Sequence, residues 1–500
     1  MSAITAWLAR LPGERRDGVA VRWLILRLLG LVYLAAFVSL WAQVDGLIGS
    51  QGIAPAAQYV AAAREQLGAS GWRQLPTVFW WDASDAALTH VFAAGTLGSV
   101  LLIIGIAPVP VLIGLQLLYL SVVHVGDVFL HFQWDYLLLE TGFLAILYAP
   151  LGLMPRPSRE RGPNVLFVLL LRWLIFRLMF SSGAVKLTSL DPHWADLTAM
   201  QFHFESQPLP PFTAWFFHQL PPFAHRLEML ATFVFELGIP FLAFGNRSAR
   251  RAACAGFLAL SAMILVTGNY GFFNWLTVAL AITVLDDADL PGWLRRAITG
   301  QPEAAPEVRP GTWRRAVALA VAVPAFALSA LHLLHSIDVN PPVPPVLAAL
   351  DETAAPYALF NEYGLFRVMT IGRPEVEIEG SDDGVAWKPY VFRYKMGDPL
   401  RRPGFVAPHM PRLDWQMWFA ALAGSGRQRW FVNFMIQLLR GSPAVLDLLE
   451  SNPFPAAPPK VVRATLYDYA FTTPEERART GAWWKRREIR AFFPPASLNK

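Results

Sequence analysis

The stretch VAVRWLILRLLGLVYLAAFVSLW, residues 19–41, decides the fold class. Apart from Arg22 and Arg27 it is almost entirely apolar, and it is long enough to cross a hydrocarbon layer about 30 Å thick as one helix. It is also longer than the apolar part of a cleaved signal peptide, which has roughly 7–15 residues. We therefore interpret it as the first membrane span.

The rest of the chain has the composition of a membrane protein. Of its 500 residues, 54% are hydrophobic and 16% are charged, whereas soluble domains carry about 25% charged residues. Apolar runs of about 17–25 residues predict an all-α polytopic helical bundle of about nine spans in residues 1–338. The predicted spans lie near residues 20–43, 86–106, 109–127, 134–153, 165–187, 227–245, 252–268, 271–286 and 314–337.

Several classes of function find no support in the sequence. Cys254 is the single cysteine, so no intrachain disulfide forms and thiol redox chemistry is not expected. The net charge of +5 is small for this length, and no patch combines basic and aromatic residues, so nucleic-acid binding is not expected. No motif for serine hydrolysis, zinc proteolysis or phosphate binding occurs. We predict no cofactor and assign no residue as a metal ligand.

Arginines in the loops indicate the orientation. The arginine-rich loops precede the first span and follow the fourth, sixth and eighth, which puts them all on one side, and the positive-inside rule makes that side cytoplasmic. These arginines are Arg10, Arg15, Arg16, Arg156, Arg159, Arg161, Arg247, Arg250, Arg251, Arg295, Arg296 and Arg309. The chain after His335 is then expected outside the cytoplasm. An Ala-, Pro- and Arg-rich composition with few lysines suggests a bacterial gene, so we expect a bacterial inner membrane protein whose C-terminal domain faces the periplasm.

The last third of the chain has a different pattern. A Pro- and Ala-rich linker at 339–356 precedes a predicted extracytoplasmic α+β domain at 357–500. Alternating apolar and polar residues predict a hairpin and two more strands, and a helical apolar pattern is interrupted by glycines. The predicted elements are the hairpin at 375–394 with its turn at 381–384, strands at 461–471 and 483–493, and two helices within 414–440 separated at 424–426.

The segment HVGDVFLHFQWD, residues 124–135, places four ionisable residues among apolar ones. At 100° per helical residue, His124, Asp127, His131 and Asp135 fall within an arc of about 80°. Four charges at mid-membrane would cost on the order of 10 kcal/mol, so this face must point into the bundle or lie at the outer interface. It is either a proton-handling or metal-binding site, or a hydrogen-bonded seam that fixes helix packing.

Lys186, at the outer end of the predicted fifth span, also has two interpretations. A single lysine there commonly extends its amine to the interface. A partly desolvated amine could instead act as a base, with His131 and Asp135 as further catalytic candidates. Other polar residues predicted on this side are His193, His203 and Glu205.

Five segments together resemble the lipase maturation factor family, over about residues 20 to 495. They are FQWDYLLLETGFLA (132–145), LRWLIFRLMFSSGAVKL (171–187), DPHWADLTAMQFHFESQPLP (191–210), TGNYGFFNWLT (267–277) and EIEGSDDGVAWKPYVFRYKMGDPLRRPGFVAPHMPRLDWQMWFAAL (377–422). The resemblance implies a non-enzymatic maturation factor or chaperone, which in animals resides in the endoplasmic reticulum membrane. Its implied partners are membrane lipid and a secreted, lipase-like client.

The resemblance also implies a client-binding surface in the C-terminal domain. The candidate contact residues are Asp382, Asp383, Arg401, Arg402, Asp414, Trp415, Gln416 and Trp418. Aromatic residues at helical spacing more often belong to a hydrophobic core, so the alternative for Trp415 and Trp418 is a purely structural role. The sequence leaves the client and the oligomeric state open.

A shorter segment, GAVKLTSLDPHWADLTAM (183–200), is similar to part of the membrane domain of vitamin K-dependent carboxylases. There, a lysine at the position matched by Lys186 acts as a base. The alternative function is therefore a membrane-embedded enzyme that uses Lys186.

Overall fold

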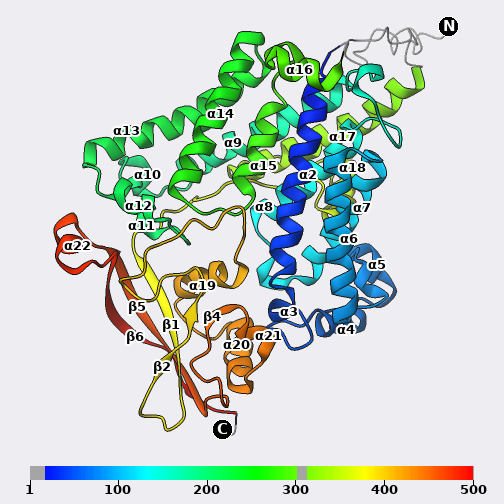
Figure 1. The fold of residues 1–500 in the computed structure, drawn as a ribbon. Helices are drawn as coiled ribbons and strands as arrows, with labels where there is room; N and C mark the ends of the chain where they lie inside the picture. The colour runs from blue at the N-terminus through cyan, green and yellow to red at the C-terminus, as the bar shows by residue number, and fades with distance from the viewer. Residues whose placement is uncertain (1–16, 301–311, 499–500) are drawn as a thin grey trace.

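Seven helices of the N-terminal part are long and apolar enough to cross a membrane. The computed structural model describes residues 17–300 and 312–498, so Arg10, Arg15, Arg16 and Arg309 lie outside the described residues. Within the described residues the long helices are α2 (Val19–Trp41), α6 (Asp85–Ile104), α7 (Pro108–Val125), α9 (Val165–Thr188), α13 with its continuation to Phe244 (Pro222–Phe244), α14 (Arg247–Thr267) and α17 (Thr312–Ser336). They form the helical bundle in the upper part of Figure 1.

The predicted fourth and eighth spans are shorter helices, so the count of nine is not confirmed. α8 (Gln133–Tyr148) has 16 residues and α15 (Phe273–Ile282) has 10. At 1.5 Å per residue they are about 24 and 15 Å long, less than the thickness of the hydrocarbon layer. α8 ends just before Pro150, and α15 begins after Gly271, whose φ of +56° breaks the helical path.

Both short helices nevertheless connect the two ends of the bundle. Beyond α8, the chain reaches the start of α2, where Arg22 donates to the Glu160 carboxylate at 2.8 Å. Beyond α15, Asp287 accepts the backbone N–H groups of Gly18 and Val19, each at 2.9 Å. The other end of α15 faces the C-terminal part of the chain, since Asn269 donates to the Gly404 carbonyl at 2.9 Å.

The arginine-rich loops meet at the end of the bundle where α2 starts. Arg250 forms an ion pair with Asp286, and Arg247 and Arg251 each lie 2.6 Å from Asp289. α16 (Gly292–Thr299) packs against α2 at this same end. The described basic loops are therefore at one end, as the orientation argument requires.

The C-terminal part, which we call the tail (residues 373–498), lies at the opposite end of the bundle (Figure 1). Its antiparallel sheet has the strand order β2-β1-β5-β6, with β1 (Arg373–Ser381), β2 (Lys388–Pro389), β5 (Val461–Phe471) and β6 (Trp484–Ala496). Helices α19 (Arg412–Ala423) and α20 (Arg429–Arg440) pack with it, and β3 (Val391–Phe392) pairs with β4 (Leu449–Ser451). The predicted strands and the break between the two helices are all found.

Local chemistry explains the turns of the tail. Asp383 accepts the backbone N–H groups of Val385 and Ala386 at 2.8 Å, and Gly384 has a φ of +76°. Gly424, at the end of α19, has a φ of +71°, the left-handed conformation that commonly ends a helix. The hairpin turn and the helix break were predicted from the sequence at these same residues.

The segment predicted as a linker is partly helical, because α18 (Pro345–Ala354) occupies most of it. The following residues, 357–372, which we call the strap, do not belong to the sheet. Asn361 and Tyr363 of the strap hydrogen-bond Glu140 of α8. The predicted soluble domain from 357 onward therefore begins with residues that are embedded in the bundle.

Shorter elements complete the connections. They are α3 (Val44–Leu47), α4 (Ala56–Leu67), α5 (Gly71–Gln74), α10 (Pro192–Ala195), α11 (Met200–Ser206), α12 (Phe212–His218), α21 (Pro443–Leu446) and α22 (Pro474–Thr480).

Candidate functional site

The predicted polar face from His124 to Asp135 does not exist as one helix face. α7 ends at Val125, Asp127 has a φ of +46°, and α8 begins only at Gln133. The turn needs glycine at position 126, since a Cβ there would collide with the side chain of Leu130. The assumption of continuous helix through Gly126 is therefore wrong.

The four residues of that segment have separate environments. His124 is bonded to the Pro356 carbonyl through Nε2 at 2.8 Å, His131 is exposed, and Asp127 is half-buried in the turn. Asp135 is fully buried and accepts hydrogen bonds from Arg412 and from the hydroxyl of Tyr119. The geometry favours a packing role for Asp135.

Asp135 and Arg412 join the tail to the bundle. The guanidinium of Arg412, on α19, makes two hydrogen bonds of 2.7 Å to the carboxylate, and it also donates to the Phe129 carbonyl at 3.0 Å. A paired guanidinium and carboxylate fit each other's planar geometry. Nearby, Gln43 accepts the backbone N–H of Arg412 at 2.8 Å, so the turn that follows α2 takes part in the same joint.

A second buried ion pair holds the strap. Glu140 of α8 pairs with Arg177 of α9, and its carboxylate also accepts the Tyr363 hydroxyl at 2.7 Å and the Asn361 backbone N–H at 3.1 Å. Arg177 in turn donates to the Asn361 carbonyl at 3.1 Å. Neither Glu140 nor Arg177 was among the predicted site residues, although an acid and a base inside adjacent predicted spans are a signal for such a pair.

Lys186 does not meet His131 or Asp135. Its amine lies 2.6 and 2.8 Å from the two carboxylate oxygens of Glu236 and donates to the Ser182 carbonyl at 2.9 Å. An ammonium ion paired with a carboxylate has no lone pair to accept a proton, so this arrangement does not present a base. The three catalytic candidates are thus not brought together, and the missed partner of Lys186 is Glu236, an acid within a predicted span.

A cavity of about 300 Å³ adjoins the Lys186–Glu236 pair. It lies between α9, α13, α14, α15 and the strap, and most of its surface is hydrocarbon. Glu236 is carried by a π-helical turn (Val234–Gly238), a feature that is frequent at functional sites. The polar lining residues are Ser182, Lys186, Trp194, His203, Glu228, Thr232, Glu236, Ser261, Thr267, Tyr270, Asn274 and Thr277. A largely apolar cavity with a few polar groups is the usual form of a small-molecule site.

The three predicted outer-side residues have defined places in or near this region. His203 lines the cavity, and burial together with the neighbouring Lys186 lowers its pKa to about 4. His193 is bonded through Nδ1 to the Thr198 hydroxyl at 3.1 Å. Glu205 accepts the Phe471 backbone N–H at 3.0 Å and so contacts the tail. Of these three, only His203 belongs to the cavity.

The four predicted client contacts on α19 are buried. Asp414 accepts the backbone N–H groups of Tyr394 and Lys395, both at 2.8 Å. Trp415 is 4% exposed, and Gln416 and Trp418 are each 8% exposed. The Trp418 indole donates to the Ser206 carbonyl at 2.8 Å. These side chains are buried where α19 packs, so they offer no surface to a client. For Trp415 and Trp418 the structure therefore favours the purely structural role.

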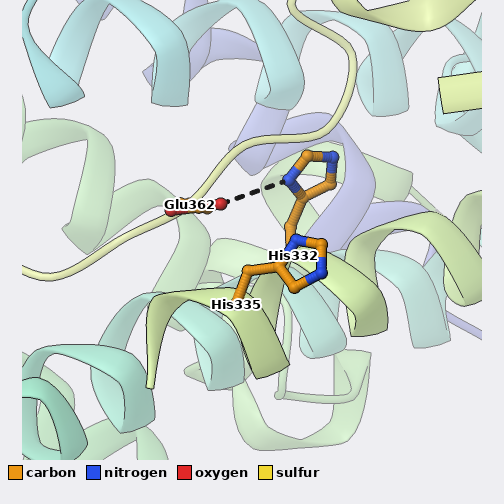
Figure 2. A group of neighbouring side chains, drawn as sticks. All are labelled: His332, His335 and Glu362. Carbon is orange, nitrogen blue, oxygen red and sulfur yellow. Dashed lines mark ion pairs between the residues drawn. The ribbon is translucent and has the colours of Figure 1, made fainter. Parts of the chain in front are cut away.

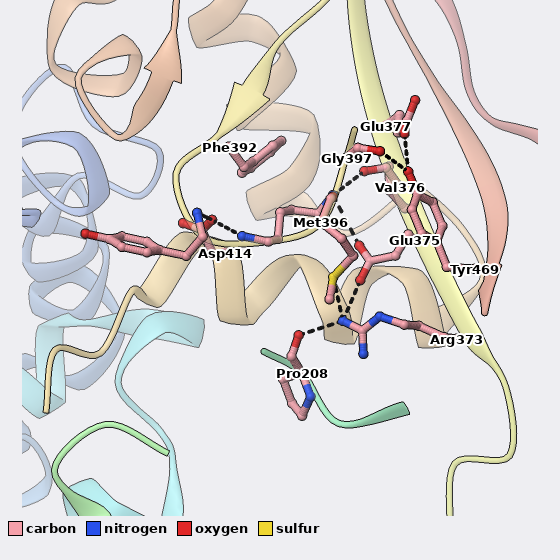
Figure 3. A network of polar contacts seen from close by, with 12 residues as sticks. Pro208, Arg373, Glu375, Val376, Glu377, Phe392, Met396, Gly397, Asp414 and Tyr469 are labelled. Carbon is pink, nitrogen blue, oxygen red and sulfur yellow. Dashed lines mark hydrogen bonds and ion pairs between the residues drawn. The ribbon is translucent and has the colours of Figure 1, made fainter. Parts of the chain in front are cut away.

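A polar network next to Asp414 explains how the tail holds its position (Figure 3). Arg373 is fully buried, donates to the Pro208 carbonyl at 2.7 Å and pairs with Glu375 at 2.9 Å. Lys395 completes the network through Glu375 at 3.1 Å. Since Pro208 precedes α12 and Arg373 starts β1, the network ties the first strand of the tail to the loops of the bundle.

The remaining client candidates are at least partly exposed. Asp382 and Asp383 lie at the tip of the hairpin, where backbone N–H groups lower the pKa of Asp383. Arg401 is half-buried and pairs with Glu450 at 2.8 Å. Arg402 stacks on the ring of Phe212, 3.8 Å from its centroid. Only the two aspartates are free to meet a partner without breaking such contacts.

One group in the described part of the chain has metal-ligand chemistry, namely His332, His335 and Glu362 (Figure 2). Their ligand atoms lie within 4.8 Å of one another. His332 Nε2 is 2.9 Å from Asp351, and its Nδ1 is 3.8 Å from Glu362. Zinc requires ligand bonds of about 2.0–2.2 Å, so the groups would have to move closer together to bind it. As it stands, the cluster is a set of polar contacts between α17, α18 and the strap.

Comparison with known proteins matches both parts of the chain. The model of the lipase maturation factor transmembrane domain matches residues 20–292, and that of the lipase maturation factor C-terminal domain matches residues 359–494. The chain belongs to the lipase maturation factor family. This confirms the family predicted from the sequence, whereas the comparisons give no support to the carboxylase-like alternative.

Curated members of the lipase maturation factor family align over nearly the whole chain. Lipase maturation factor 2 of Gallus gallus is 34% identical over 95% of this chain and 81% of its own length. Lipase maturation factor 2 of Homo sapiens is 36% identical over 95% of this chain and 82% of its own length. Lipase maturation factor 1 of Bos taurus is 34% identical over 97% of this chain and 91% of its own length. No solved structure matches the chain.

Proposed function

We propose that this chain is a membrane-embedded maturation factor that helps secreted, lipase-like proteins to fold or to be exported. Its relatives are named lipase maturation factors and align over most of their length. The observation that carries the proposal is the attachment of the tail to one end of the bundle through the buried Arg412–Asp135 pair. A sheet held in this way is presented at the membrane surface, where an exported chain emerges.

The proposed topology has nine crossings, seven by full-length helices and two by α8 and α15. It is supported by the contacts of Glu160 and Asp287 at the start of α2, which put both short helices between the two ends. The arginine-rich end would face the cytoplasm, and the tail would face the opposite side. In a bacterial inner membrane this side is the periplasm.

The client surface is proposed on the exposed part of the tail. β6 is an edge strand of 13 residues, and its residues from Lys485 to Ala491 are exposed. An unpaired strand edge can add an extended segment of another chain. Val385, at the hairpin tip beside Asp382 and Asp383, is 82% exposed, and Ile489 of β6 is 48% exposed.

Site-specific photo-crosslinking tests this surface. A photoreactive amino acid at Val385 or Ile489 should capture a co-expressed secreted lipase during its synthesis. Trp293, 67% exposed on α16 at the arginine-rich end, is the matched control and should capture none. Equal capture at Trp293, or none at the tail positions, contradicts the proposal.

The orientation has its own test. An alkaline phosphatase reporter fused after Lys500 should be active in intact bacterial cells, because that enzyme needs an oxidising compartment for its disulfides. If a reporter fused at this position is active only in the cytoplasm, the proposed topology is refuted.

A further inference from the structure

We propose that the cavity beside Lys186 binds a neutral membrane lipid that carries a carbonyl oxygen, an acylglycerol ester in particular. The inference rests on three independent properties of the cavity: its access, its unpaired donors and its charge.

The cavity reaches the outer surface of the bundle. Met263 of α14 lines the cavity and is 49% exposed, and Ala231 of α13 is also both lining and exposed. The opening therefore lies between two of the long apolar helices, on a surface that a bilayer would cover. A volume of about 300 Å³ is at the lower end of ligand pockets. It suits a lipid head with the start of one chain, while the remaining hydrocarbon stays in the membrane.

Two buried donors of the cavity wall lack partners. The indole Nε1–H of Trp194 and the amide Nδ2 of Asn274 have no hydrogen-bond acceptor among the described residues. Both residues line the cavity, and they are only 3% and 2% exposed. A buried donor without a partner costs about 1–3 kcal/mol. In the unliganded protein both donor atoms are shielded from the cavity space, so the two side chains would turn towards a bound ligand. An acceptor oxygen would then satisfy them, and a pure hydrocarbon would not.

The charges of the cavity favour a neutral ligand. Lys186 and Glu236 neutralise each other within 2.6 Å, and His203 is uncharged at neutral pH because burial and Lys186 lower its pKa to about 4. A fatty-acid carboxylate would therefore meet the Glu236 carboxylate without a free cation to balance it. An ester carbonyl has the acceptor that Trp194 and Asn274 require and adds no charge.

The cavity also connects the bundle with the strap. Leu365 and Phe366 form part of its wall. The Phe366 ring packs against His203 and Tyr270 with centroid distances of 4.9 and 6.0 Å. A lipid in the cavity would thus contact both the bundle and the chain that leads into the tail.

The test uses the purified full-length protein in lipid nanodiscs. Three photoreactive probes with the same chain are compared: a diacylglycerol, the dialkylglycerol ether that lacks both carbonyls, and a fatty acid. We expect the ester to label peptides around 194 and 274 about five- to tenfold more than the ether, which corresponds to the loss of about one hydrogen bond. We also expect it to exceed the fatty acid. Equal labelling by ester and ether overturns the proposal, and preferential labelling by the fatty acid overturns the neutral-ligand assignment.

Variants that remove only the donors give a second, independent readout. Trp194→Phe and Asn274→Leu should each reduce labelling by the ester several-fold towards the ether level. Trp134→Phe and Gln116→Leu are matched controls, because these buried side chains also have unpaired donors but do not line the cavity. If both cavity variants label like the wild type, the donors do not bind the lipid and the proposal fails. If a variant does not fold, the ester–ether contrast in the wild-type protein still decides.

Discussion

The guanidinium of Arg412 and the carboxylate of Asp135 face each other through two hydrogen bonds of 2.7 Å, although 277 residues separate them in the chain. Both side chains are completely buried. The desolvation of such a pair offsets much of its attraction, but removing one partner leaves the other as an unpaired buried charge. The pair therefore makes the attachment of the tail sensitive to single substitutions on either side.

Arg412→Met should destabilise the protein by about 3–5 kcal/mol, because Asp135 is left buried without its partner. Thermal unfolding in detergent, followed by tryptophan fluorescence, measures the effect. Arg401→Ala is the control, since its pair with Glu450 is partly exposed and such pairs contribute about 0–1 kcal/mol. Combining Arg412→Met with Asp135→Leu should recover much of the loss. A double variant as unstable as the single one would show that the unpaired charge is not the cause.

The fold class was readable from the sequence because the membrane imposes length and apolarity on each span. The hairpin turn and the break at Gly424 were readable because Asp383, Gly384 and Gly424 have strong local preferences. The lengths of the two short helices were overestimated for the opposite reason. Apolar residues continue beyond the ends of α8 and α15, and the apolar pattern alone does not show that Pro150 or Gly271 interrupts the helix.

The candidate site was less predictable, because its contacts join residues far apart in the chain. Lys186 was singled out, but its partner Glu236 lies 50 residues later and Asn274 lies later still. The predicted face from His124 to Asp135 failed because α7 ends at Val125, and a side chain at position 126 would collide with Leu130. A search for ion pairs between ionisable residues of different spans would have predicted the site better than grouping the ionisable residues of one span.

Lys186→Met should destabilise the bundle, because Glu236 would remain buried without a cation. The expected loss is about 3–5 kcal/mol, and a second substitution, Glu236→Gln, should restore part of it. Thermal unfolding of the two single variants and the double variant forms a complete cycle. If Lys186→Met is as stable as the wild type, the ion pair is not a structural element of the bundle. That outcome would reopen a chemical role for the amine.

Trp415→Ala should reduce client capture only by destabilising the tail. The side chain is 4% exposed, and truncating a buried tryptophan costs about 3–5 kcal/mol. Val385→Ser, at a side chain that is 82% exposed, should leave the unfolding temperature unchanged while it lowers crosslinking to the client. Trp415→Ala should therefore lower both stability and client capture, whereas Val385→Ser should lower capture alone. A Trp415→Ala variant with normal stability and lost capture would mean that this tryptophan contacts the client after all.

Acid should weaken the contact between the tail and the bundle through His409. Its Nδ1 is 2.9 Å from the Ser39 hydroxyl of α2, and burial, Arg412 and Arg393 lower its pKa to about 4. The unfolded chain takes up a proton near pH 6.5, whereas the folded chain resists protonation until about pH 4. Between these values the unfolded state binds more protons, so stability falls as the pH falls. His409→Gln should flatten this part of a plot of unfolding temperature against pH, and the exposed His90→Gln should not. An unchanged slope in the His409 variant would assign the acid sensitivity to other groups.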